Sequence, residues 1–298
     1  MRLDEPLLEL GITGSAYAAP VDGGLGIGFS EHELVSPASV MKIQIALTIE
    51  NLTAQGLLDG TAKRIVPSGS RTPGPTGMSL MRDEITISVR DLVVAMLTIS
   101  DNVATDELIE LAGLDAINRT TRGLGMERTE VTSNLREMLR NMALEVGFED
   151  FDSFVAHNPD FDGAPSTREI AERIEASAAL DPTRGSRTTA FETVTLLQEI
   201  WTDRAGDRNA CHSVREIMER QLTRSRIASG FSADTKVAAK SGALMGVVRN
   251  EAGVVALPDG SAFAVAIFTR REKENTTKPG IIDGVIGRVA RSLIDAIQ

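Results

Sequence analysis

The sequence predicts an α/β (α+β) protein in which a five-stranded antiparallel sheet is flanked by helices and joined by an all-α subdomain. Two β-like runs stand near the N-terminus, three more follow residue 230, and a long block of helical patterns separates them. Isolated sheets of two and three strands would be marginal, so we expect the chain ends to share one sheet. The prediction is one domain, 1–298, with a sheet subdomain from about 1–50 and 230–298 and a helical subdomain from about 51–229.

The strands are predicted from short apolar runs bounded by turn residues. Residues 14–19 and 24–29 flank the turn-forming tetrapeptide at 20–23 (PVDG), which predicts a hairpin. The C-terminal β-rich runs are 235–239, 245–256 and 262–269, and the turn 258–260 separates the last two.

The first long helix is predicted to begin at Ser36 and Pro37, because serine at the cap and proline at the first helical position favour a helix start. The apolar run behind them indicates that this helix is buried. Further helical patterns cover 89–99, 104–111, 116–124, 190–201 and 280–297.

Residues 137–187 are acidic and contain four of the nine phenylalanines, at 148, 151, 154 and 161. We interpret this segment as an inserted lid. Within it, Ser166 to Glu169 fits a capping box, which predicts a helix from there to about residue 179.

Composition excludes several classes of function. The chain holds 31 Lys and Arg against 42 Asp and Glu, a net charge of −11, and only 4% of its residues are aromatic, so nucleic acid is not an expected partner. Cys211 stands alone and the three histidines lack metal-ligand spacing, so we expect no metal and no cofactor.

Without a signal-peptide or membrane-spanning run, the chain as written is expected to be cytoplasmic, or secreted or periplasmic if a leader was removed. The oligomeric state stays open.

A first chemical motif places a hydroxyl and an amine three residues apart, at Ser39 and Lys42 (SVMK). Residues three apart on a helix share a face, so the two side chains can meet. A buried lysine with a lowered pKa can take the hydroxyl proton, and the first helical turn favours developing negative charge. This spacing alone is expected about once by chance in a chain of this length.

A second motif, Ser100-Asp101-Asn102, lies between two predicted helices. Ser100 could relay a proton to a leaving nitrogen, and the Asn102 amide could bind a substrate carbonyl or hold the lysine. Taken alone, the motif is more simply a helix N-cap.

A third motif, Lys240-Ser241-Gly242, closes the β-rich run that ends at residue 239. A cation, a hydroxyl and a glycine that admits a ligand to the backbone suit an anionic substrate. The alternative is a β-turn with a solvated lysine. Three motifs in this order, each in a fitting context, are very improbable by chance, and they predict an active site.

The three motifs resemble the signature of the penicillin-recognising serine hydrolases, specifically the class A β-lactamases. The resemblance spans roughly Gly14 to the C-terminus, because the order of predicted strands and helices also matches that family. It implies that Ser39 is the acylated nucleophile, that Lys42 is its base or proton carrier, and that Ser100 protonates the leaving nitrogen.

The resemblance also implies the substrate-binding residues. Asn102 and Lys240 would shape the site, and Ser241, beside Gly242, would contact a substrate carboxylate. The backbone N–H groups of Ser39 and Ala243 would form the oxyanion hole.

Arg249 is a further candidate for binding the substrate carboxylate. It stands in the next predicted strand, where we expect antiparallel pairing to bring it beside Lys240, and the family places a carboxylate-binding arginine at a comparable position. A bidentate guanidinium suits a carboxylate. The alternative is a surface arginine paired with Glu251.

The sequence departs from the family at the residue that activates the deacylating water, a glutamate in an E-x-x-L-N segment. Alignment places Leu135 at that position. The segment 137–141 (EMLRN) fits only if one residue is inserted, which makes Glu137 a candidate base. Acylation is therefore predicted, whereas efficient deacylation is not.

Three functions remain open at this stage, each with a small-molecule acyl substrate as the partner. The first is a β-lactamase-like serine hydrolase acylated at Ser39 by β-lactams or related amides and esters. The second is a D-Ala-D-Ala peptidase, esterase or amidase with a penicillin-binding fold. The third is a non-catalytic binding protein.

Overall fold

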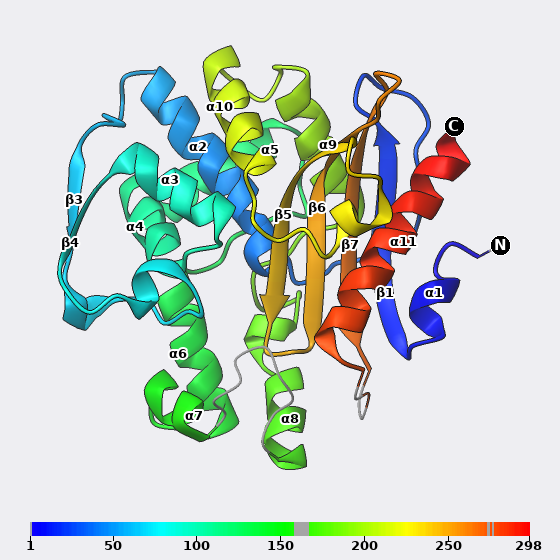
Figure 1. Ribbon diagram of the computed structural model, residues 1–298. Coiled ribbons are helices and arrows are strands. Elements are labelled where there is room, and N and C mark those ends of the chain that lie inside the picture. Colours follow the sequence, from blue (N-terminus) through cyan, green and yellow to red (C-terminus); the bar gives the residue numbers. More distant parts are fainter. Residues whose placement is uncertain (1, 158–166, 273–274, 276) are drawn as a thin grey trace.

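Five strands form one antiparallel sheet in the computed structural model, which describes residues 2–157, 167–272, 275 and 277–298. The strands, in the spatial order β2-β1-β7-β6-β5 (Figure 1), are β1 (Ile12–Pro20), β2 (Ile27–Phe29), β5 (Lys236–Leu244), β6 (Val248–Ala256) and β7 (Ala262–Arg271). β1 pairs with β7 along its whole length. This pairing confirms the predicted fold class and the prediction that both chain ends share one sheet.

The helices follow the predicted order, with additions at the N-terminus and between 135 and 219. They are α1 (Glu5–Leu8), α2 (Lys42–Ala54), α3 (Val89–Thr98), α4 (Asn102–Ala112), α5 (Leu114–Gly123), α6 (Leu135–Val146), α7 (Phe151–His157), α8 (Arg168–Glu175), α9 (Ala190–Trp201), α10 (Arg208–Glu219) and α11 (Pro279–Ile297). No helix within the described ranges is long and apolar enough to cross a membrane.

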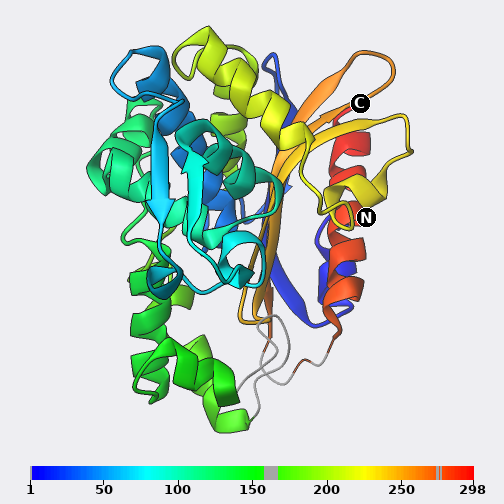
Figure 2. The same ribbon diagram turned by 60° about the vertical axis from the view of Figure 1, so that its left-hand side comes forward.

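Helices cover both faces of the sheet, so its central strands are buried almost throughout rather than on alternate residues. All of β6 is buried except the half-buried Ala256. One face packs against the apolar stripe of α11, including Val285, Val289 and Leu293. The other face packs against α9 and the helical subdomain, as Figure 2 shows with the sheet seen nearly edge-on. β5 is the edge strand nearest the helical subdomain.

The helical subdomain differs from the prediction in containing a second sheet. β3 (Lys63–Val66) and β4 (Ile85–Ser88) pair antiparallel, so the region 51–229 is not entirely helical. Each strand has four residues and most of them are exposed or half-buried, so neither gives an apolar run that sequence patterns would reveal.

The predicted boundary of the lid at residue 137 is wrong, because α6 begins at Leu135 and continues through that position. Phe151 and Phe154 are buried in a third core cluster together with residues of the β5-β6 turn, so these phenylalanines pack as core. The helix predicted to reach residue 179 ends at Glu175, and Thr167 caps it. Residues 158–166, which include Phe161 and Ser166, lie outside the described residues.

Candidate active site

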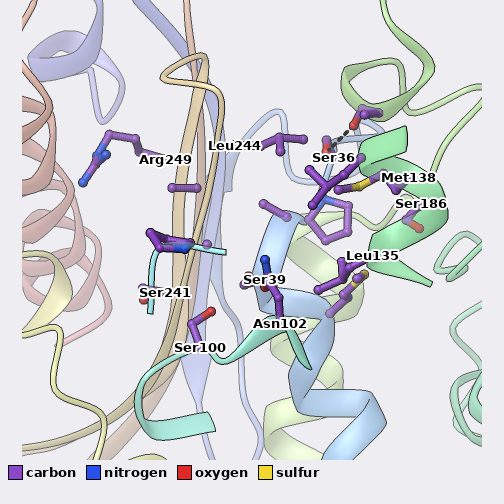
Figure 3. A pocket seen from close by; sticks show the side chains of 18 of the residues that line it. Ser36, Ser39, Ser100, Asn102, Leu135, Met138, Ser186, Ser241, Leu244 and Arg249 are labelled. Atoms are coloured by element: carbon purple, nitrogen blue, oxygen red, sulfur yellow. Dashed lines mark hydrogen bonds between the residues drawn. The ribbon is translucent and has the colours of Figure 1, made fainter. Parts of the chain in front are cut away.

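A cavity of about 760 Å³ lies between the edge strand β5, the start of α2, the turn before α4 and the helix α6. It brings together most of the predicted site residues, several of which are labelled in Figure 3. Those that line it are Ser39, Ser100, Asn102, Glu137, Ser241, Gly242, Ala243 and Arg249. Lys42 and Lys240 are 0% exposed and lie in the protein beneath these groups.

Ser39 is half-buried in a 3-10 turn, Ala38–Met41, that leads directly into α2. The residue before it, Ala38, has a φ of +46°, a strained conformation for a residue with a Cβ. The predicted capping by Ser36 is wrong, since the Ser36 hydroxyl donates to the Ala179 carbonyl 3.1 Å away. Asn250 on β6 holds this turn instead, because its amide donates to the carbonyls of Ser36 and Pro37.

The Lys42 amine is surrounded by the second motif. Its Nζ donates to the Ser100 carbonyl at 2.7 Å, to the Ser100 hydroxyl at 3.2 Å and to Asn102 Oδ1 at 2.9 Å. Burial lowers the pKa of Lys42 to about 7, although the charges of Asp101 and Asp106 act in the opposite direction. The lowered pKa makes the unprotonated amine, which can accept a proton, more accessible near neutral pH.

The second motif is both a helix cap and part of the site. Asp101 caps α4 by accepting from the Ala104 N–H, and it is fully buried. Ser100 adopts a φ of +59°, which turns the chain sharply before the helix. Because the middle residue makes the cap, Ser100 and Asn102 are left to face Lys42 and the cavity (Figure 3).

The third motif lies inside β5 rather than after it, because the strand continues to Leu244. Lys240 is buried and donates to the Ser241 carbonyl at 2.6 Å. Burial and then the nearby charges of Lys42 and Arg226 bring the pKa of Lys240 well below its usual value. The alternative interpretation, a solvated lysine in a β-turn, is therefore wrong.

Gly242 lies against the backbone of Ser39. A Cβ at this position would stand 2.9 Å from the Pro37 carbonyl oxygen and 3.0 Å from the Ser39 nitrogen, which is too close for an unshifted backbone. The Ser241 N–H donates to Gln221, away from β6, and N–H groups two residues apart on a strand point to the same edge. The Ala243 N–H therefore points to the edge of β5 that faces away from β6.

Arg249 lies neither beside Lys240, as predicted, nor at the surface paired with Glu251, which was the alternative. It pairs with Ala243 in the sheet, whereas Lys240 pairs with Ala252, so Arg249 and Lys240 project from opposite faces. Its guanidinium donates to both carboxylate oxygens of Asp283, at 2.8 and 3.1 Å, rather than pairing with Glu251 at the surface. Figure 3 shows it directed away from Ser39, although it lines one end of the cavity.

Asp283 on α11 also accepts from Arg226 at 2.9 Å. Burial opposes the ionisation of this carboxyl, but the Arg249 hydrogen bond and the two guanidinium charges outweigh it and hold the pKa of Asp283 below its usual value. Two arginines share this one carboxylate, so the three groups together carry one net positive charge, and the Glu251 carboxylate also acts on Arg226.

The α6 wall of the cavity holds Leu135 and Glu137. Leu135 is 5% exposed and lines the cavity (Figure 3). Its N–H donates to Asp106 at 2.7 Å, and Asp106 thereby fixes the start of α6. Glu137 is exposed, and its N–H donates to the capping side chain of Asn134.

Several residues that shape the site were not found from the sequence. Each is a polar side chain that bonds the backbone or a charged side chain of a site element: Asp106, Gln221, Arg226, Asn250 and Asp283. Their partners are distant in the chain, so spacing carried no signal. Within the described part of the chain, no group of three or more His, Cys, Asp and Glu residues is arranged to hold a metal ion.

Comparisons with known proteins find a matching family model and a similar chain. The family model described as the beta-lactamase enzyme family matches residues 7–297. The chain is 30% identical over 310 residues to the beta-lactamase regulatory protein BlaB of Streptomyces cacaoi, across 100% of this chain and 96% of that protein.

Solved structures show the same fold. The beta-lactamase from Sphaerobacter thermophilus superposes with a TM-score of 0.75 at 22% identity, covering 99% of this chain and 94% of that one. A leucine-to-glutamate mutant of PBP-A, solved as an acyl-enzyme complex with penicillin G, gives a TM-score of 0.74 at 17% identity, with 99% and 95% covered.

Proposed function

The chain belongs to the β-lactamase enzyme family, and on that premise we propose that Ser39 is acylated by β-lactams or related amides and esters and that the acyl-enzyme is hydrolysed slowly. The observation that carries this proposal is the buried Lys42 amine. Lys42 stands three residues after Ser39, whose hydroxyl lines the cavity. Its pKa is about 7, and its amine donates hydrogen bonds to Ser100 and Asn102.

Acylation begins with attack of Ser39 Oγ on the carbonyl carbon. The hydroxyl proton passes to the unprotonated Lys42 Nζ while the Oγ–C bond forms. The carbonyl oxygen gains negative charge, and hydrogen bonds donated by the N–H groups of Ser39 and Ala243 stabilise this charge. Gly242 lets β5 approach the Ser39 backbone closely, which brings these two N–H groups near each other.

Breakdown of the tetrahedral intermediate then breaks the C–N bond. The leaving nitrogen takes the Ser100 proton, and Ser100 regains one from Lys42 Nζ, 3.2 Å away. The net result of this relay is the transfer of one proton from Ser39 to the leaving nitrogen, and Lys42 returns to its starting protonation state. A substrate carboxylate is drawn to the positive end of the cavity, near Ser241 and the Arg226-Arg249-Asp283 group.

Deacylation requires water with a general base close to the acyl carbonyl. Leu135 presents an apolar side chain on the α6 wall, where the family resemblance expects a carboxylate. Glu137 also lines the cavity, but it is exposed and stands two positions after Leu135, on another side of α6. We therefore expect the acyl-enzyme to persist.

A second candidate function is a β-lactam-binding regulator that uses acylation as its signal. Two observations favour it: the apolar residue at the deacylation position, and the similarity to a protein named as a β-lactamase regulatory protein. This candidate shares the acylation step and differs only in what the adduct does.

Intact mass spectrometry after mixing with benzylpenicillin tests the proposal. We expect one adduct per chain in the wild type, none in Ser39→Ala, and an unchanged adduct in the control Ser292→Ala, which lies on α11 outside the cavity. An adduct that survives in Ser39→Ala would contradict the assignment. An adduct that decays within seconds would favour an efficient hydrolase over a regulator.

A further inference from the structure

We propose that Asn250 is a positioning residue for acylation. From the central strand β6 its side chain holds the turn before Ser39, and it thereby keeps the Ser39 hydroxyl and N–H directed at the carbonyl of the acyl donor. This inference rests on the proposed function, because it concerns the attack of Ser39 on that carbonyl.

The side-chain amide of Asn250 is fully buried, and each of its polar atoms has a partner. Its Nδ2 donates to the Ser36 carbonyl at 2.9 Å and to the Pro37 carbonyl at 3.3 Å, and its Oδ1 accepts from the Thr269 N–H at 3.0 Å. A backbone N–H can only donate and a carbonyl can only accept, so these partners fix the orientation of the amide. Both of its donor hydrogens are therefore used on the turn.

The turn that Asn250 holds is strained. Ala38 has a φ of +46°, a conformation that costs energy for a residue with a Cβ and persists only where its surroundings fix it. The Pro37 carbonyl also accepts from the Val40 N–H at 3.1 Å, so the same carbonyl starts the 3-10 turn that carries Ser39. Fixing the carbonyls of Ser36 and Pro37 sets the two peptide planes before Ala38. Those planes set the direction in which the chain enters Ser39.

Asn250 acts beside Gly242, its partner in the sheet register. Paired residues of antiparallel strands project from the same face. A Cβ at Gly242 would stand 2.9 Å from the Pro37 carbonyl oxygen and 3.0 Å from the Ser39 nitrogen, so the glycine lets β5 approach the turn and Asn250 supplies the donors that hold it. Arg226 braces this pair, because its Nη1 donates to the carbonyls of Gly242 and Asn250 at 2.8 and 2.6 Å.

This placement predicts an effect on the rate of acylation rather than on substrate binding. Asn250 is fully buried and does not line the active-site cavity, so the substrate does not touch it. Its turn carries the nucleophile and one of the proposed oxyanion donors, and a misplacement of about 1 Å in such groups can cost on the order of 10²-fold in rate.

Stopped-flow acylation by a chromogenic cephalosporin tests the inference. Measured over a range of concentrations, it gives the limiting acylation rate and the concentration for half-maximal rate. Asn250→Asp keeps the size of the side chain and the acceptor for Thr269, but it removes the two donors. We expect the limiting rate to fall at least about tenfold, with little change in the half-saturating concentration.

The matched control is Asn118→Asp. Asn118 is 7% exposed, and its amide donates to the Val131 carbonyl at 2.9 Å, outside the cavity. This substitution also removes a buried donor to a backbone carbonyl, so it should lower the melting temperature while keeping the wild-type limiting rate. Asn250→Ser is too short to reach the two carbonyls and buries no charge, so it repeats the test if Asn250→Asp does not fold, and we expect the same fall.

A wild-type limiting rate in a folded Asn250 variant would overturn the inference while leaving acylation of Ser39 intact. An equal fall in Asn118→Asp would also overturn it, because the loss would then follow from a destabilised fold. A change confined to the half-saturating concentration would assign Asn250 to substrate binding instead. No acylation of the wild type would refute the proposed function, and the inference with it.

Discussion

Leu135→Glu should speed the release of the acyl group from Ser39. The position lies on the α6 wall of the cavity, and its backbone N–H stays bound to Asp106 whatever the side chain. A carboxylate there would face the cavity and could take a proton from an attacking water. The nearby charge of Asp106 would raise the pKa of the introduced carboxyl, which brings it closer to a useful general base.

The size of the effect follows from what general-base assistance supplies, typically about 10²- to 10⁴-fold in rate. The substitution also removes a leucine that is 5% exposed, whose burial is worth about 1.5–3 kcal/mol. An acidic residue in the first turn of a helix recovers about 0.3–1 kcal/mol of this. We therefore expect a folded but less stable variant with deacylation at least about 10²-fold faster.

The assay is the decay of the benzylpenicillin adduct after excess ligand is removed, followed by intact mass. Leu135→Gln is the matched control, because it has nearly the same shape as the glutamate and no base, and it should decay as slowly as the wild type. Thermal melts of both variants show whether they remain folded. A folded Leu135→Glu that acylates normally but deacylates at the wild-type rate would refute the reasoning.

Three further predictions concern acylation. The pKa of Lys42 near 7 predicts that the acylation rate falls as pH drops below 7, since protonation removes the base, and levels off above it; a pH-independent rate between 5.5 and 8.5 would contradict this. Gly242→Ala should slow acylation on the order of 10²-fold by crowding the Ser39 N–H, as stopped-flow measurement with a chromogenic cephalosporin would show, and an unchanged rate would exclude the oxyanion role. Arg249→Ala removes the net charge shared with Asp283, so acylation by carboxylated β-lactams should fall about tenfold while hydrolysis of a small neutral ester changes little; equal losses would indicate a structural role.

The sheet and most helices could be predicted because their signals are local. β1, β7 and α9 each lie in a short window of apolar periodicity or turn residues, and the predicted bounds of α9 match the structure at both ends. The sequences of β3 and β4 contain no apolar periodicity of this kind, because each strand has four residues and most of them are exposed or half-buried.

The candidate site was predictable in its residue types but not in its geometry. Lys42 bonds Ser100 and Asn102, and Ser39 and Ser100 line the same cavity. The partner of Arg249 could not be predicted, because Asp283 lies in another element and the sheet register places the arginine opposite Ala243. Asp106 was missed for the same reason, since its contact with Leu135 exists only after folding.

The slow decay of an acyl group on Ser39 is the central claim, and presteady-state cleavage of a chromogenic cephalosporin tests it most directly. We predict a burst of product close to one equivalent of enzyme followed by slow turnover, in both the wild type and Glu137→Gln. Rapid linear turnover without a burst in the wild type, lost in Glu137→Gln, would contradict the account and assign the deacylating base to Glu137.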